Sequence, residues 1–211
     1  GGEAGMHPSN IHDNAYAFGT VDFTGDMPVI LGPDGPSLGG FVCPATVISA
    51  DLWKIGQLAA GDTIRFIAVT IESAVSELRL GQEEVDNLRA LAGETVTVAD
   101  HTASAETVTL HGLEVKLRCS GDSWVLVEFG EMVLDIELRF LAHRLMLSLD
   151  QEKIAGVLEL TPGIRSLQVH FDPLRIAQGS LFKHLKRIIQ QLAENKAVSY
   201  THLTLPTTLV V

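Results

Sequence analysis

The spacing of hydrophobic and polar positions changes twice along the chain, and these changes divide the sequence into three stretches. The first, residues 1–71, is dense in Gly, Pro, Asp and Asn between short apolar runs. This pattern is typical of short strands separated by turns. The expected strands are Val29–Leu31, Phe41–Val42, Val47–Ile48 and Thr63–Val69, with one or two helical turns over Ala50–Leu58.

The second stretch, residues 72–113, begins with a helical spacing of apolar residues. The residues on this spacing are Val75, Leu78, Leu80, Val85, Leu88 and Leu91. They predict an amphipathic helix that breaks near Gly81. The Thr- and Ala-rich sequence that follows has weak patterning, so we interpret 72–113 as a connector with a helix.

The third stretch, residues 114–195, has the most regular pattern. Its expected elements are strands Glu114–Cys119 and Val125–Phe129, helix Asp135–Leu149, strands Val157–Leu160 and Ser166–Phe171, and a final helix capped by Ser180. Two apolar rows, Ile136/Phe140/Leu147 and Leu138/Leu141/Leu145, predict a wide buried face on the first helix. The order ββαββα predicts a two-layer α+β domain with helices over an antiparallel sheet.

The last residues, 196–211, differ in composition from the rest of the chain. After Lys196 charge is absent and Thr dominates. The segment resembles translated sequencing-adapter sequence, and we exclude it from functional reasoning. Because position 1 is not Met, the chain is expected to begin within a longer protein.

Composition narrows the class of protein. With 15 Lys+Arg against 26 Asp+Glu the formal charge is −11, which argues against a nucleic-acid partner. No apolar run approaches the roughly 18 residues that a membrane span needs. Cys43 and Cys119 stand alone without a paired motif, which fits a reducing compartment, and a cytoplasmic location is expected.

The densest polar cluster, HPSNIHDNAY, lies at residues 7–16. One interpretation is a loop whose side chains hold their own turns. The other is a pocket wall that offers carboxylate and amide groups to a small polar ligand. His7, His12 and Asp13 could ligate a metal, but ligand spacing does not recur elsewhere, so no metal site is expected. Arg165, expected in a turn between strands, is the cation there that could meet an anion.

Two long runs resemble one enzyme family. The run from Gly1 to Phe66, GGEAGMHPSNIHDNAY and onward to AGDTIRF, closely resembles the KipA-like (allophanate hydrolase subunit 2) half of a urea carboxylase carboxyltransferase domain. GDSWVLVEFGEMVLDIELRFLAHRLM and GVLELTPGIRSLQVHFDPL resemble the start of the KipI-like (allophanate hydrolase subunit 1) half. A KipA-like end followed by a KipI-like start is the order found in urea carboxylase.

The resemblance implies an α+β, β-rich fold. Residues 1–71 would be the C-terminal part of the KipA-like subdomain, within a cyclophilin-like β-barrel. Residues 114–195 would be the small KipI-like ββαββα domain. The chain would then be a fragment, inactive alone, of an ATP- and biotin-dependent ligase. Biotin would be carried on another domain, and ATP and Mg would be used by a biotin carboxylase domain of the same protein.

The implied reaction transfers a carboxyl group from carboxybiotin to urea and gives allophanate. On this interpretation Asp13 would hold or deprotonate urea, with Asn10 and Asn14 as amide partners. His12 and Tyr16 would donate to the urea carbonyl or to the biotin ureido oxygen, and Arg165 would bind substrate. Three alternatives remain open: part of an ATP-dependent 5-oxoprolinase, a related hydrolase, or a non-catalytic KipI/KipA-type regulatory module. Guanidine-type substrates are also open.

Overall fold

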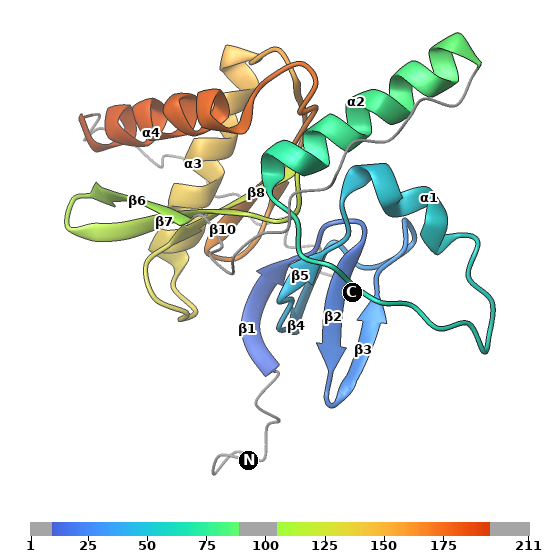
Figure 1. The fold of residues 1–211 in the computed structure, drawn as a ribbon. Coiled ribbons are helices and arrows are strands. Elements are labelled where there is room, and N and C mark those ends of the chain that lie inside the picture. The colour runs from blue at the N-terminus through green and yellow to red at the C-terminus, as the bar shows by residue number, and fades with distance from the viewer. Residues whose placement is uncertain (1–9, 89–104, 195–211) are drawn as a thin grey trace, which may run out of the picture.

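The computed structural model describes residues 10–88 and 105–194 (Figure 1). The first part contains β1 (Asn10–Ala15), β2 (Thr20–Thr24), β3 (Met27–Ile30), β4 (Leu38–Phe41), β5 (Ala45–Thr46), a 3₁₀ turn (Ser49–Asp51), α1 (Leu52–Ile55) and α2 (Ile71–Asn87). The second part contains β6 (Ala105–Leu110), β7 (Leu113–Cys119), β8 (Trp124–Phe129), α3 (Ile136–Glu152), β9 (Val157–Pro162), β10 (Ser166–Phe171) and α4 (Gln178–Glu194). The predicted α+β class is confirmed.

The strands of the first part form two small antiparallel sheets, β1–β4 and β3–β2–β5, and the described residues do not close a barrel. Strands are present near Val29 and Phe41 as predicted, whereas Val47–Ile48 lies just after β5. The predicted strand Thr63–Val69 is wrong. Only Val69 forms an isolated bridge, and Phe66 is 58% exposed. Strand propensity alone does not make a strand where no neighbour completes the hydrogen-bond ladder.

Helix α2 is capped at its N-terminus by Thr70, whose hydroxyl accepts a hydrogen bond from the backbone N–H of Ser73 at 3.1 Å. Its last residue is Asn87, and the C-cap residue Leu88 adopts a left-handed conformation. The predicted break at Gly81 is wrong, because a glycine costs a helix only about 1 kcal/mol relative to alanine. Val85 is 68% exposed, so this apolar row is not fully buried. Leu91, at the end of the predicted row, lies outside the described residues.

The second part is one antiparallel sheet in the order β6–β7–β8–β10–β9, and α3 and α4 pack against it (Figure 1). The predicted ββαββα elements are all present, and β6 adds a strand that the sequence pattern did not indicate. The predicted cap at Ser180 is wrong, since α4 already begins at Gln178 and the N–H of Ser180 donates to the carbonyl of Ala177. Within the described ranges no helix combines the length and the apolar character that a membrane crossing needs.

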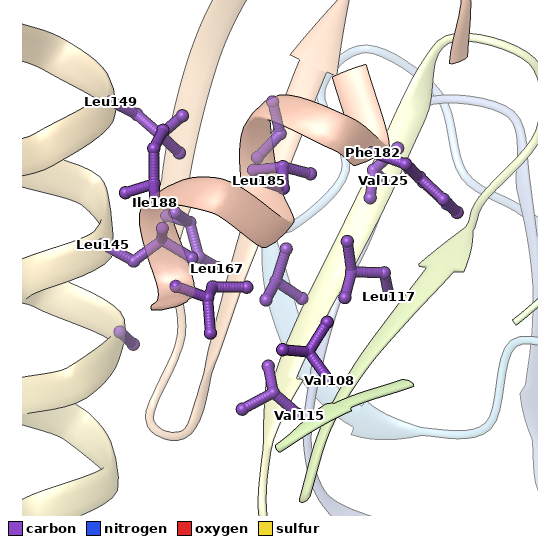
Figure 2. Packing of buried hydrophobic residues seen from close by; sticks show 14 of the residues in the cluster. Val108, Val115, Leu117, Val125, Leu145, Leu149, Leu167, Phe182, Leu185 and Ile188 are labelled. Atoms are coloured by element: carbon purple, nitrogen blue, oxygen red, sulfur yellow. The ribbon is translucent and has the colours of Figure 1, made fainter. Parts of the chain in front are cut away.

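The hydrophobic core lies between this sheet and its two helices (Figure 2). Alternate residues of β7, β8 and β10, among them Val115, Val127 and Leu167, are fully buried there. Helix α3 contributes one stripe, made of Leu138, Ala142, Leu145 and Leu149. The predicted row Ile136/Phe140/Leu147 is wrong for Ile136 and Leu147, which are 66% and 45% exposed, because a single stripe of α3 meets the sheet and α4.

Replacing Leu145 by Ala should lower the free energy of unfolding by about 3 kcal/mol, because it leaves a cavity in a fully buried layer. The matched control is Leu147→Ala, two residues along the same helix and largely exposed, which should change it by less than about 0.5 kcal/mol. Guanidinium chloride unfolding, followed by circular dichroism, measures both. Equal losses in the two variants would contradict this account of the core.

Candidate active site

Strand β1 carries most of the predicted site residues and is irregular where they lie. Asn10 pairs with Phe41 and Asn14 with Gly39, so three residues of β1 face a single residue of β4 between these pairs. The backbone of His12 and Asp13 therefore lies within a bulge. Bulges turn side chains out of the regular alternation and are frequent beside active sites. The side chains of Asn10, His12 and Asp13, and all of His7, lie outside what the structure describes.

Two glycines of β4 make room for this strand. A Cβ at Gly39 would lie 2.4 Å from the ring of Tyr16, and a Cβ at Gly40 would lie 2.9 Å from the carbonyl oxygen of Ile11. The Tyr16 side chain is buried, and its hydroxyl accepts a hydrogen bond from the backbone N–H of Phe41 at 2.8 Å. The sequence Gly39-Gly40 is therefore required by the close packing of β1 on β4.

Asn14, on the same strand, hydrogen-bonds the thiol of Cys43. Burial and the negative charge of Asp22 together raise the pKa of Cys43 to about 11, which outweighs the opposite effect of the Asn14 bond. Burial also raises the pKa of Asp22, despite a hydrogen bond from Thr24. The Cys43 thiol thus stays protonated at neutral pH, and a nucleophilic role does not fit it.

The side chain of Arg165 is buried and forms an ion pair with Glu128 on the neighbouring strand β8. Its guanidinium donates to Glu128 of β8 at 2.7 Å and to the carbonyl oxygen of Gly130 at 3.3 Å. The other Glu128 oxygen is held by Arg118 at 2.5 Å. Both Arg165 and Glu128 are more than nine-tenths buried. This side chain is thus occupied by a carboxylate of the same chain, and substrate binding by Arg165 would require that pair to open.

A second polar contact joins the two parts of the chain. One oxygen of buried Asp122, just before β8, accepts hydrogen bonds from the backbone N–H and the hydroxyl of Ser49, at 2.9 and 3.0 Å. The hydroxyl of Ser49 also lies 3.0 Å from that of Ser123. These bonds fix the position of the first part relative to the five-stranded sheet.

Beside this contact lies a cavity of about 300 Å³ between the two parts, lined on one side by Phe18, Ser49 and Leu52. On the other side lie Trp124 and His170, whose rings stack with centroids 3.9 Å apart. Burial lowers the pKa of His170, against smaller opposite effects of Glu159 and Asp172. Neither ring was singled out from the sequence, because a lone His and a lone Trp carry no motif.

No group of three or more His, Cys, Asp and Glu side chains that could hold a metal ion occurs in residues 10–88 and 105–194. Those ranges offer hydrogen-bonding and acid–base groups instead. They come from both parts of the chain, with the bulged strand β1 in one and the sheet strands β8 and β10 in the other.

Comparison with known proteins gives the family. Residues 1–68 match the model of the carboxyltransferase domain, subdomain A and B, and residues 115–209 match that of subdomain C and D. This chain belongs to the carboxyltransferase domain family. The resemblance to the urea carboxylase carboxyltransferase region, drawn above from two separate runs of sequence, is confirmed.

Several relatives of this carboxyltransferase chain are urea-processing enzymes. Urea amidolyase of Saccharomyces cerevisiae is 38% identical over 193 residues, which are 88% of this chain and 10% of that protein. The crystal structure of Kluyveromyces lactis urea carboxylase superposes with a TM-score of 0.82 at 36% identity, covering 90% of this chain and 18% of that one. A 5-oxoprolinase subunit of Haemophilus influenzae is 33% identical over 41% of this chain and 28% of its own. The chain thus spans a small fraction of the relatives that it matches.

Replacing Arg165 by Met should lower the free energy of unfolding by about 3 kcal/mol, because buried Glu128 loses one of its two cations. Adding Glu128→Leu to this variant should recover much of the loss, since the uncompensated carboxylate is removed. The control is Arg175→Met, whose pair with Asp172 is 3.4 Å long and mostly exposed, with little change expected. Guanidinium chloride unfolding measures all three. A double variant no more stable than the single one would contradict the ion-pair account.

The lowered pKa of His170 predicts a pH-dependent stability. Its folded pKa lies below its unfolded value near 6.5, so below about pH 6.5 the unfolded state binds more protons. The free energy of unfolding should therefore fall between pH 7.5 and 5.5. His170→Phe keeps a ring against Trp124 but cannot be protonated, and should lose less stability over this range. Guanidinium chloride unfolding at both pH values tests this, and equal losses in both proteins would contradict it.

Proposed function

We propose that this chain forms part of the carboxyltransferase site of a biotin-dependent urea carboxylase, which transfers a carboxyl group from carboxybiotin to urea and gives allophanate. The observation that carries the proposal is the match to Kluyveromyces lactis urea carboxylase. Over 90% of this chain the two backbones superpose, and the sequences are 36% identical. An identity of 38% to urea amidolyase supports the same substrate.

The proposed roles follow from the chemistry of adding a carboxyl group to an amide-like nitrogen. A urea nitrogen would form a bond to the carboxyl carbon as the bond from that carbon to the biotin nitrogen breaks. The urea nitrogen would lose one proton and the released biotin nitrogen would gain one, so the site needs a proton acceptor. Asp13 is the proposed acceptor, and His12 the group that donates a hydrogen bond to the urea carbonyl or the biotin ureido oxygen. Asn10 is proposed as an amide partner of urea. The position of His12 and Asp13 within a β-bulge, just after Asn10, supports these roles.

The other predicted substrate-binding residues already have partners. The Asn14 amide is bonded to Cys43, the Tyr16 hydroxyl accepts from Phe41, and Arg165 is paired with Glu128. Each is proposed to act with its remaining hydrogen-bonding capacity, or by holding β1 and the sheet in position.

Biotin would supply the carboxyl group in an activated form when its carrier domain brings it to the site. The residues present fit its uncharged ureido group, because β1 offers imidazole and amide groups that can donate hydrogen bonds to it. His12 and Tyr16 are the residues proposed to lie toward that group. ATP and Mg would be used by the biotin carboxylase domain of the same full-length protein. A cytoplasmic location for that protein is proposed from the two free cysteines of this chain.

A second candidate is a component of a 5-oxoprolinase. It is favoured by the 33% identity to the Haemophilus influenzae 5-oxoprolinase protein over 88 residues. This match covers less than half of the chain, whereas the urea amidolyase match covers 88%. We therefore place the urea carboxylase function first and the 5-oxoprolinase function second. A regulatory KipI/KipA-type module is a third alternative.

Asp13→Asn in the full-length protein should lower kcat for urea carboxylation by about 100-fold or more, because the amide cannot accept the proton. The measurement is urea-dependent incorporation of labelled bicarbonate into allophanate. The biotin-dependent cleavage of ATP without urea should be unchanged, since it needs no proton acceptor for urea.

Asp34→Asn is the matched control, since Asp34 is an exposed carboxylate in the loop before β4, and it should retain wild-type activity. An Asp13→Asn enzyme with wild-type kcat would remove Asp13 from the catalytic role. A wild-type enzyme that carboxylates no urea but hydrolyses 5-oxoproline with ATP would favour the second candidate.

A further inference from the structure

Strand β10 presents two buried polar side chains that each carry a polar atom without a hydrogen-bond partner among the described residues. Gln168 is 1% exposed and Ser166 is 3% exposed. The Nε2 atom of Gln168 and the Oγ atom of Ser166 make no hydrogen bond to any described residue. Burying such a group unpaired costs about 1–3 kcal/mol, so orphaned groups in a native structure call for an explanation.

Both side chains point away from the hydrophobic core. Leu167, Val169 and Phe171 of β10 lie in the core cluster, so the alternation of a strand places Ser166 and Gln168 on the opposite face. Beside Gln168 stand Leu126 of β8 and Thr161 of β9, its register partners.

The bulged strand β1 lies against β10. Since β8 and β9 occupy both edges of β10 and the helices cover its core face, β1 approaches the face that carries Ser166 and Gln168. The unpartnered atoms of Ser166 and Gln168 thus lie on the face of β10 that β1 approaches. Strand β1 is the strand that contains Asn10, His12 and Asp13.

We propose that Gln168 is a substrate-binding residue, whose side-chain amide hydrogen-bonds urea between β10 and β1, with Ser166 as a second donor. This inference rests on the proposed urea carboxylase function. Urea is small, uncharged and carries both N–H donors and a carbonyl acceptor. A carboxamide offers the complementary donor and acceptor in one plane, and a neutral pair avoids the desolvation cost of a buried charge.

Because these atoms have no partner among the described residues, a substitution can distinguish a role in substrate binding from a role in stability. Gln168→Leu has a similar size and removes an unpaired buried amide, so it should leave the melting temperature unchanged or raise it. In the full-length enzyme the same variant should raise KM for urea about tenfold or more, while biotin-dependent ATP cleavage without urea stays at the wild-type rate. Ser166→Ala should raise KM by a smaller factor and keep the fold.

The matched control is Gln190→Leu, the same change at an exposed position of α4, which should alter neither KM nor melting temperature. A Gln168→Leu enzyme with a lower melting temperature and wild-type KM would show a structural bond and overturn the proposal, as would unchanged values of both. If the wild-type enzyme carboxylates no urea, the proposed function fails instead. In that case isothermal titration of urea into wild type and Gln168→Leu tests the binding site alone, and equal affinities or no binding would overturn it.

Discussion

The central strands of the five-stranded sheet are buried on both faces, and the rest of the structure depends on how the second face is satisfied. One face of β8 and β10 is entirely apolar and packs on α3 and α4. The other carries Glu128, Ser166 and Gln168, all buried. Such a face cannot be covered by an apolar surface without leaving polar groups unpaired, so it needs ion pairs, a polar neighbouring strand or a ligand. Glu128 is satisfied by Arg118 and Arg165, and β1 covers β10.

Much of the second part could be predicted from its sequence, because strong periodicity and clear turns determine its elements. Strands β7, β8, β9 and β10 were all expected within two residues of their ends. Strand β6 was missed, because Val108 and Leu110 alternate with threonines, and only pairing with β7 makes these two residues part of the core. The error at Thr63–Val69 is the converse, since an apolar β-branched segment has no strand to pair with among the described residues.

Of the two strands that form the proposed site, only β1 could be recognised from the sequence as part of a site, and β10 could not. A dense run of His, Asp and Asn draws attention in any sequence, and it led to β1. The bulge in β1 depends on its register with Gly39 and Gly40, which no local pattern reveals. Gln168 carries no motif, and its burial follows from packing between distant segments. Arg165, expected in a turn, was found there but paired with Glu128 across the sheet.

Because the proposed site lies between the two parts of the chain, β1 and β10 must keep a fixed relative position. Hydrogen bonds between the two parts provide this. Asp122 and Ser123 precede β8, while Ser49 follows β5, so their hydrogen bonds tie the sheet to the part that contains β1. The two hydrogen bonds that Ser49 donates to the Asp122 carboxylate are charge-assisted and partly buried, which makes them strong and directional. A small shift at this contact would move β1 relative to β10, and positioning errors of about 1 Å are costly for catalysis. The contact between Asp122 and Ser49 is thus a positioning element for the proposed site, although neither residue needs to touch a substrate.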